Sequence, residues 1–168
     1  MEKRCTYGIL FAAALLFTSI VALPDSATAD DVFFAVLNSQ QEIQDPKPNS
    51  KAFGNALMTF TNSDSMLCYS ISYSDLVGTE NNAHFHAPAS VGENASVLFA
   101  ISPAPSPFGS PKTGCVGPLT DQDRSNLRRG LFYINIHSST FPSGEIRGQV
   151  LPVNRVRQKP GETVADTD

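Results

Sequence analysis

The feature that most constrains the fold is a set of seven short segments with strand-like patterning. The clearest is Met66–Tyr73, in which every second residue from Leu67 to Tyr73 is apolar or aromatic and the residues between them are Cys or Ser. Side chains of a strand alternate between the two faces of a sheet, so this run predicts a half-buried antiparallel strand. The seven predicted strands are Asp31–Leu37, Gly54–Thr61, Met66–Tyr73, Asn82–His86, Ser96–Ile101, Leu131–His137 and Glu145–Leu151. Together they predict an all-β fold, an antiparallel Greek-key or immunoglobulin-like β-sandwich.

Two segments between these strands have a different character. Ser102–Pro118 is rich in Pro and Gly and is predicted to be a long loop. Thr120–Arg129 is the one helical candidate, because Thr120 followed by Asp123 resembles a capping box and Gly130 marks a stop. We expect this helix to be short and to lie on the surface.

The first 29 residues resemble a secretory signal peptide. Lys3 and Arg4 precede the apolar run Tyr7–Leu23, and Ala27-Thr28-Ala29 forms an A-x-A cleavage site. We therefore expect a secreted or periplasmic mature chain that begins at Asp30 and has no stable membrane insertion after cleavage. An uncleaved membrane anchor is the alternative, since the apolar run approaches the length of a short transmembrane helix.

Residues 30–152 are predicted to form one folded domain. Residues 153–168 contain few apolar side chains and are predicted to form a disordered C-terminal tail. The formal net charge is −4, and no stripe of Lys and Arg is present. Both observations argue against a nucleic-acid partner.

The cysteines predict one disulfide. The chain has three cysteines, and cleavage of the signal peptide removes Cys5 and leaves Cys68 and Cys115. A pair of cysteines in an exported chain most often forms a disulfide. A metal-binding or reactive pair is the alternative, but the two residues lack the close spacing of a Cys-rich zinc site.

All three histidines lie in two of the predicted strands. His84 and His86 flank Phe85, and His137 ends the strand Leu131–His137. If the apolar residues of these strands face the core, all three imidazoles face outward. Three imidazoles that converge from neighbouring strands predict a site for copper or zinc. Histidines near strand ends also act as hydrogen-bonding residues that organise turns, and the sequence leaves both interpretations open.

Two further residues are candidates for orienting the metal ligands. Asn135 shares a face with His137, and Glu145 lies across the predicted hairpin from His137, where its carboxylate would orient the imidazole ring. Glu145 also shares the outward face with Arg147. We favour the simpler interpretation for that pair, an exposed Glu/Arg ion pair that contributes less than about 1 kcal/mol.

Two sequence elements resemble the CHRD domain family, the repeat named after chordin. His84-Phe85-His86-Ala87-Pro88-Ala89, followed by Gly92 and Asn94, resembles the family's H-x-H-G-P-A…G…N element, with Ala87 where the family usually has Gly. The second element is Gly130–His137 followed by Phe141–Gln149, which resembles the family's closing signature. The resemblance covers nearly the whole mature chain and implies an exported β-sandwich domain.

The resemblance implies little about activity, because a fold does not define a function. The H-x-H strand is also similar to the copper-binding strand of copper/zinc superoxide dismutase, but no second histidine cluster for a zinc subsite is present. No nucleophile elbow, phosphate loop or close carboxylate pair occurs in a recognisable frame. We therefore expect a non-catalytic binding domain that coordinates Cu or Zn. The alternative is a module that binds an extracellular or envelope protein and in which the histidines are structural.

Overall fold

The structure is a computed structural model, and it describes residues 30–102 and 108–153. The predicted signal peptide and residues 154–168 of the predicted tail lie outside these residues. The described part contains eight strands, β1 (Asp31–Asn38), β2 (Phe53–Thr61), β3 (Met66–Ser74), β4 (Glu80–His86), β5 (Val97–Ser102), β6 (Lys112–Val116), β7 (Phe132–Ser138) and β8 (Ile146–Pro152). It also contains a short 3-10 helix, η1 (Ser39–Gln41), and one α-helix, α1 (Asp121–Arg128).

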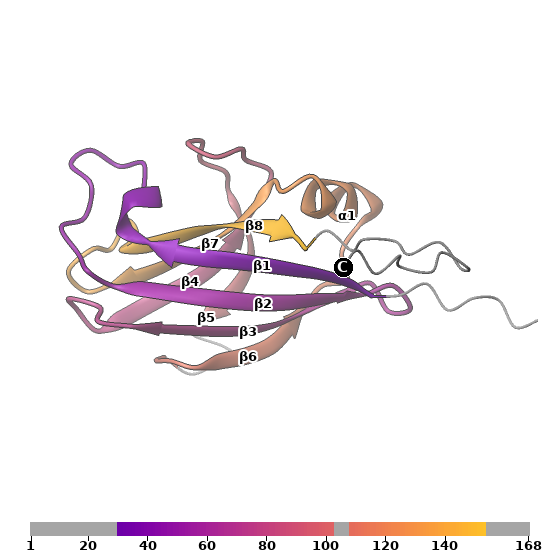
Figure 1. The fold of residues 1–168 in the computed structure, drawn as a ribbon, viewed down its shortest axis with the longest axis horizontal. Coiled ribbons are helices and arrows are strands. Elements are labelled where there is room, and N and C mark those ends of the chain that lie inside the picture. The colour runs from indigo at the N-terminus through magenta and orange to yellow at the C-terminus, as the bar shows by residue number, and fades with distance from the viewer. Residues whose placement is uncertain (1–29, 103–107, 154–168) are drawn as a thin grey trace, which may run out of the picture.

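All eight strands belong to one antiparallel sheet with the order β5-β4-β7-β8-β1-β2-β3-β6. The sheet folds over on itself, so that β4 and β5 lie behind β2 and β3 in Figure 1 and the edge strands β5 and β6 contact each other. The predicted all-β antiparallel sandwich is confirmed. Its two layers are halves of one continuous sheet.

Strand β6 corrects the sequence prediction, which placed its residues in a loop. Lys112–Val116 pairs with β3, and Cys115 lies directly opposite Cys68 in that register. The predicted disulfide between these two residues is confirmed. The pattern of β6 was hidden because the strand is only five residues long, contains Gly114 and lies between prolines.

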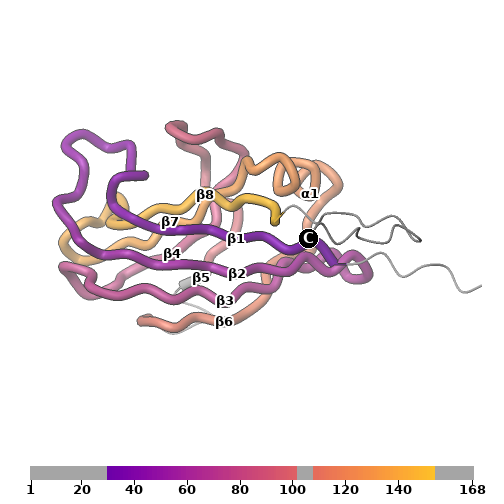
Figure 2. Tube along the Cα trace, in the orientation of Figure 1, coloured from indigo at the N-terminus to yellow at the C-terminus, as the bar shows by residue number. Residues whose placement is uncertain are grey.

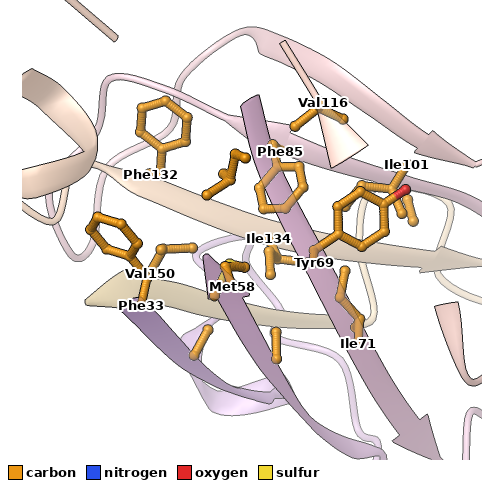
Figure 3. Close-up of a cluster of buried hydrophobic side chains, with 14 of the residues drawn as sticks. Phe33, Met58, Tyr69, Ile71, Phe85, Ile101, Val116, Phe132, Ile134 and Val150 are labelled. Atoms are coloured by element: carbon orange, nitrogen blue, oxygen red, sulfur yellow. The ribbon is translucent and has the colours of Figure 1, made fainter. Parts of the chain in front are cut away.

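The core lies between the two layers of the sheet. Phe33 of β1, Phe85 of β4 and Ile134 of β7 are fully buried there. The rings of Tyr69 from β3 and Phe85 from β4 meet edge to face with centroids 5.6 Å apart, a favourable geometry for aromatic pairs. Figure 3 shows these side chains gathered between strands of both layers. Burial of Phe85 fixes the strand register and turns His84 and His86 to the opposite face.

Helix α1 begins and ends as the sequence predicts. Thr120 and Asp123 form a capping box, in which each side chain accepts a hydrogen bond from the backbone N–H of the other residue. Leu127 is buried and anchors the helix to the domain. Gly130 follows with a φ of 71°, a left-handed conformation that glycine adopts without strain. Among the described residues, no helix has the length and apolar character needed to cross a membrane.

Two long loops cover the outer face of β7 and β8. One joins β1 to β2 through η1, and the other joins β4 to β5 through residues 87–96. Figure 2 shows both loops rising above β7 and β8 on the same side of the molecule. The loops therefore shield the outer face of β7 and the first part of β8, including Arg147 and Gln149, from solvent.

Candidate metal centre

The outer face of β4, β7 and β8 is lined by polar and aromatic side chains in three cross-strand rows. Each row follows from the strand register, which places His84 opposite Asn135, His86 opposite Tyr133 and Asn82 opposite His137. The face consists of Asn82, His84 and His86 on β4, Tyr133, Asn135 and His137 on β7, and Arg147 and Gln149 on β8. Polar side chains on the outer face of a sheet are normally exposed to solvent. Here loops cover them, which indicates that this face forms a binding site.

The covering loops are held by hydrogen bonds from this face. Arg147 donates to the carbonyl oxygen of Glu93 at 2.6 Å and to Oδ1 of Asn94 at 3.2 Å. Gln149 donates to the carbonyl oxygen of Ala89 at 2.9 Å. As a result Arg147 is only 2% exposed and His86 only 8% exposed, although both lie on the outer side of the sheet.

The three histidines converge at the edge of this face. The Nδ1 atom of His84 lies 3.1 Å from Nε2 of His137 on the neighbouring strand. One ring nitrogen from each of His84, His86 and His137 lies within 4.8 Å of the other two. The rings are steeply inclined, at 86° between His84 and His86 and 70° between His84 and His137, so both pairs are T-shaped rather than stacked. The alternation predicted from the sequence brings the three residues together.

Backbone carbonyls fix the protonation of two of the rings. Nδ1 of His86 lies 2.9 Å from the carbonyl oxygen of Ala95, and Nδ1 of His137 lies 3.0 Å from that of Pro142. A carbonyl oxygen only accepts hydrogen bonds, so both Nδ1 atoms carry the proton and both Nε2 atoms carry a lone pair. Metal-binding histidines are commonly oriented in this way.

The remaining ring completes the network. Since Nε2 of His137 is an acceptor, Nδ1 of His84 donates a proton to it. No described residue donates to Nε2 of His86, although this atom is buried. A buried acceptor without a partner is costly, and a metal ion would satisfy it.

All three imidazoles are held in the neutral form that binds metals. Burial is the largest cause in each case, and it lowers the pKa of His84 to about 4, with the charges of His137 and His86 adding to the effect. Burial also lowers the pKa of His86, and among the smaller contributions the guanidinium of Arg147 acts in the same direction. The pKa of His137 is lowered by burial as well, against the opposing hydrogen bond to Pro142.

A stacked column supports His86 from the side. Its ring lies parallel to that of Tyr133, with centroids 4.6 Å apart and an angle of 2°. The guanidinium carbon of Arg147 lies 3.5 Å from the centroid of the Tyr133 ring. The Tyr133 hydroxyl donates to the carbonyl oxygen of Ala95, which also accepts from His86. Tyr133 therefore holds the imidazole plane and the loop together.

The prediction of an exposed Glu145/Arg147 pair is wrong, because the covering loops bury both residues. Glu145 is 0% exposed, and its Oε1 accepts hydrogen bonds from the Ser50 hydroxyl at 2.6 Å and from the backbone N–H of Val77 at 2.7 Å. The roles predicted for Glu145 and Asn135 in orienting the metal ligands stay predictions. The hydrogen-bond partner of Nδ1 in His137 is the carbonyl oxygen of Pro142.

Sequence reasoning missed Glu42, a buried acid beside this face. It follows η1 and is 3% exposed. Burial raises the pKa of Glu42 to about 7, although the charges of Arg147 and Lys47 and a hydrogen bond from Asn135 oppose the rise. Nothing in the polar loop sequence distinguishes Glu42 from its neighbours. The signal in the sequence was the set of polar and aromatic residues at the outward positions of β4, β7 and β8, from Asn82 to His86, Tyr133 to His137 and Arg147 to Gln149. Such a face requires loops that cover it.

A sandwich whose loop-covered face gathers three neutral imidazoles defines an all-β domain with a candidate transition-metal centre. The chain belongs to the CHRD domain family, since the family's model matches residues 33–150, a range that includes all three histidines. Comparison with curated proteins and with solved structures gave no match.

Proposed function

We propose that this CHRD domain is a non-catalytic binding module that holds one copper or zinc ion at His84, His86 and His137. The observation that carries the proposal is the convergence of three ring nitrogens within 4.8 Å of one another. Bonds of about 2.0–2.1 Å from two imidazoles to a tetrahedral ion place their nitrogens about 3.3 Å apart. The 3.1 Å between His84 and His137 is close to that value.

The protonation pattern supports the same proposal. Nε2 of His86 and Nε2 of His137 already carry lone pairs, because the carbonyl oxygens of Ala95 and Pro142 hold the protons on Nδ1. His84 frees its own Nδ1 when its proton moves to Nε2, a change of tautomer without change of charge. Accepting an ion therefore requires this change of tautomer and side-chain movements that bring all three ring nitrogens closer together than 4.8 Å.

We place this activity outside the cytoplasm, in the secreted or periplasmic compartment. The Cys68–Cys115 disulfide is compatible with that placement, because disulfides persist in oxidising compartments. The signal-peptide pattern of residues 1–29 supports it as well.

Isothermal titration calorimetry with Cu(II) and Zn(II) tests the proposal. We expect one ion per chain, and a loss of affinity of at least about 100-fold in His84→Ala and His137→Ala, since each loses one of three ligands. Asn82→Ala is the matched control, because Asn82 lies on the same face of β4 directly opposite His137. Unchanged binding in both histidine variants would contradict the proposal.

A second candidate function rests on an exposed apolar row on the outer face of the sheet, in a part that the two loops do not cover. Leu151 of β8, Phe34 of β1 and Leu57 of β2 are cross-strand neighbours, and they are 53%, 42% and 54% exposed. Large exposed apolar side chains in one row mark interaction surfaces. This row suits a module that binds an extracellular or envelope protein.

The two functions make different predictions for capture of a partner from the native envelope fraction. If the apolar row binds a protein, Phe34→Ser and Leu57→Ser abolish capture and His137→Ala leaves it intact. If capture survives the substitutions in the apolar row, this second function is wrong.

A further inference from the structure

The donor set of the histidine cluster carries no negative charge. Within the described residues, the group of possible metal ligands contains His84, His86 and His137 and neither a carboxylate nor a thiolate. The outer partners of His86 and His137 are backbone carbonyls, which are neutral. A carboxylate that accepts a hydrogen bond from an imidazole makes the ligating nitrogen more negative. A neutral carbonyl oxygen has the same effect to a smaller extent. Any charge on a bound ion is therefore left uncompensated by its ligands.

A fixed positive charge lies beside the cluster. Arg147 remains protonated at every physiological pH, and its guanidinium contacts one face of Tyr133 while His86 stacks on that ring from β4. The order of strands β4-β7-β8 puts Tyr133 between the two groups. The acceptors of the guanidinium are the carbonyl of Glu93 and the amide oxygen of Asn94, and neither is charged.

Nearby carboxyl groups offset this charge only in part. Glu42 interacts electrostatically with Arg147, but its pKa of about 7 leaves it partly protonated at neutral pH. The carboxylate of Glu145 is held by Ser50 and Val77. The buried surroundings screen the guanidinium less than water would, so it acts on whatever charge the histidines hold.

From this arrangement we infer that the three-histidine site selects monovalent copper over divalent ions. The inference rests on the proposed metal binding and specifies the ion. A positive surrounding disfavours a divalent ion more than a monovalent one, and among the metals that imidazole binds, copper has a stable monovalent state. Three ligands suffice for Cu(I), whereas a zinc site with three protein ligands needs a fourth ligand from solvent or substrate.

The test compares Cu(I) and Zn(II) affinities of the full chain by competition with chromophoric chelators, without oxygen for Cu(I). Asn94→Asp is the informative variant, because it places a carboxylate against the guanidinium on an exposed loop residue. We expect it to strengthen Zn(II) binding about tenfold while Cu(I) binding changes less than about threefold. Arg147→Met removes the charge itself and should change the ratio in the same direction.

Asn55→Asp is the matched control, since it makes the same change of charge at an exposed position of β2, away from the column. Melting temperatures establish that each variant is folded. Two results would overturn the inference and leave metal binding intact. One is that the unsubstituted protein binds Zn(II) at least as tightly as Cu(I). The other is that Asn94→Asp changes the ratio of Cu(I) to Zn(II) affinity no more than Asn55→Asp does. Failure of the unsubstituted protein to bind either ion would instead refute the proposed function and the inference with it.

Discussion

Nδ1 of His84 lies 3.1 Å from Nε2 of His137, and the two strands that bring them together are far apart in sequence. A single proton joins the two nitrogens, because Nδ1 of His137 donates to Pro142. The same spacing suits two ligands of one ion. The arrangement of His84 and His137 can thus either form this hydrogen bond or supply two ligands to one metal ion. When an ion binds, it takes the place of the proton between the two nitrogens.

In Glu42→Gln, which removes the titration of Glu42 near pH 7, metal affinity should be nearly independent of pH between about pH 8 and pH 6. Protons compete with a metal for imidazole only below the pKa of the ring, and burial lowers the pKa of His84 to about 4 and lowers those of His86 and His137. Titration of Zn(II) into buffers across this range measures the effect. An affinity that already falls steeply near pH 6.5, the ordinary value for histidine, would contradict the burial of the cluster.

Glu42 should make the protein less stable as pH rises. Its pKa in the folded protein is raised from 4.5 to about 7, so the folded state binds the proton more tightly than the unfolded state does. The contribution of Glu42 to stability is therefore fully present below pH 4.5 and is lost as pH rises through 7. We expect Glu42→Gln to be more stable than the unsubstituted protein by about 2 kcal/mol at pH 8 and equally stable near pH 4. Urea unfolding at both pH values measures this, and a difference independent of pH would contradict it.

Tyr133 should control metal affinity through its ring more than through its hydroxyl. Tyr133→Phe keeps the stack on His86 and loses the bond to Ala95, whereas Tyr133→Leu loses both. Loss of an outer partner typically weakens metal binding 10- to 100-fold, so we expect about tenfold for Tyr133→Leu and less than about threefold for Tyr133→Phe. Equal affinities in two folded variants would show that the stack does not position His86.

The Cys68–Cys115 disulfide should stabilise the fold without affecting the metal site. It joins residues 47 positions apart, and closing a loop of that length restricts the unfolded chain by roughly 4 kcal/mol in the chain-entropy model. The double variant Cys68→Ala/Cys115→Ala should lose stability of this order in chemical denaturation. Its Zn(II) affinity should match that of the unsubstituted protein, because Cys68, between buried Leu67 and Tyr69, faces outward from one layer, while the histidines face outward from the other layer across the core. A large change in affinity would contradict this separation.

Local patterns predicted the strands that carry the site. Alternation around Phe85 and Ile136 placed His84, His86 and His137 on one face, because burial of apolar side chains fixes the strand register. The capping box of Thr120 and Asp123 was equally local and equally predictable. Period-two alternation and helix caps depend on neighbours in sequence, so a single sequence contains them.

The burial of Arg147 and Glu145 could not be predicted in the same way. It depends on loops that reach the outer face from distant parts of the chain, such as Glu93 over Arg147 and Ser50 over Glu145. Polar residues at outward positions normally indicate solvent, and only the tertiary arrangement shows that these are covered. Strand β6 was missed for a related reason, since its pairing with β3 rather than its own composition makes it a strand.

The central claim, that three imidazoles share one ion, is tested most directly by X-ray absorption fine structure at the metal edge of the loaded protein. We predict three imidazole nitrogens at about 2.0–2.1 Å from one copper or zinc ion per chain, and two in His137→Ala. A loaded protein whose ion has no more than one imidazole ligand, with a spectrum unchanged in His137→Ala, would contradict it.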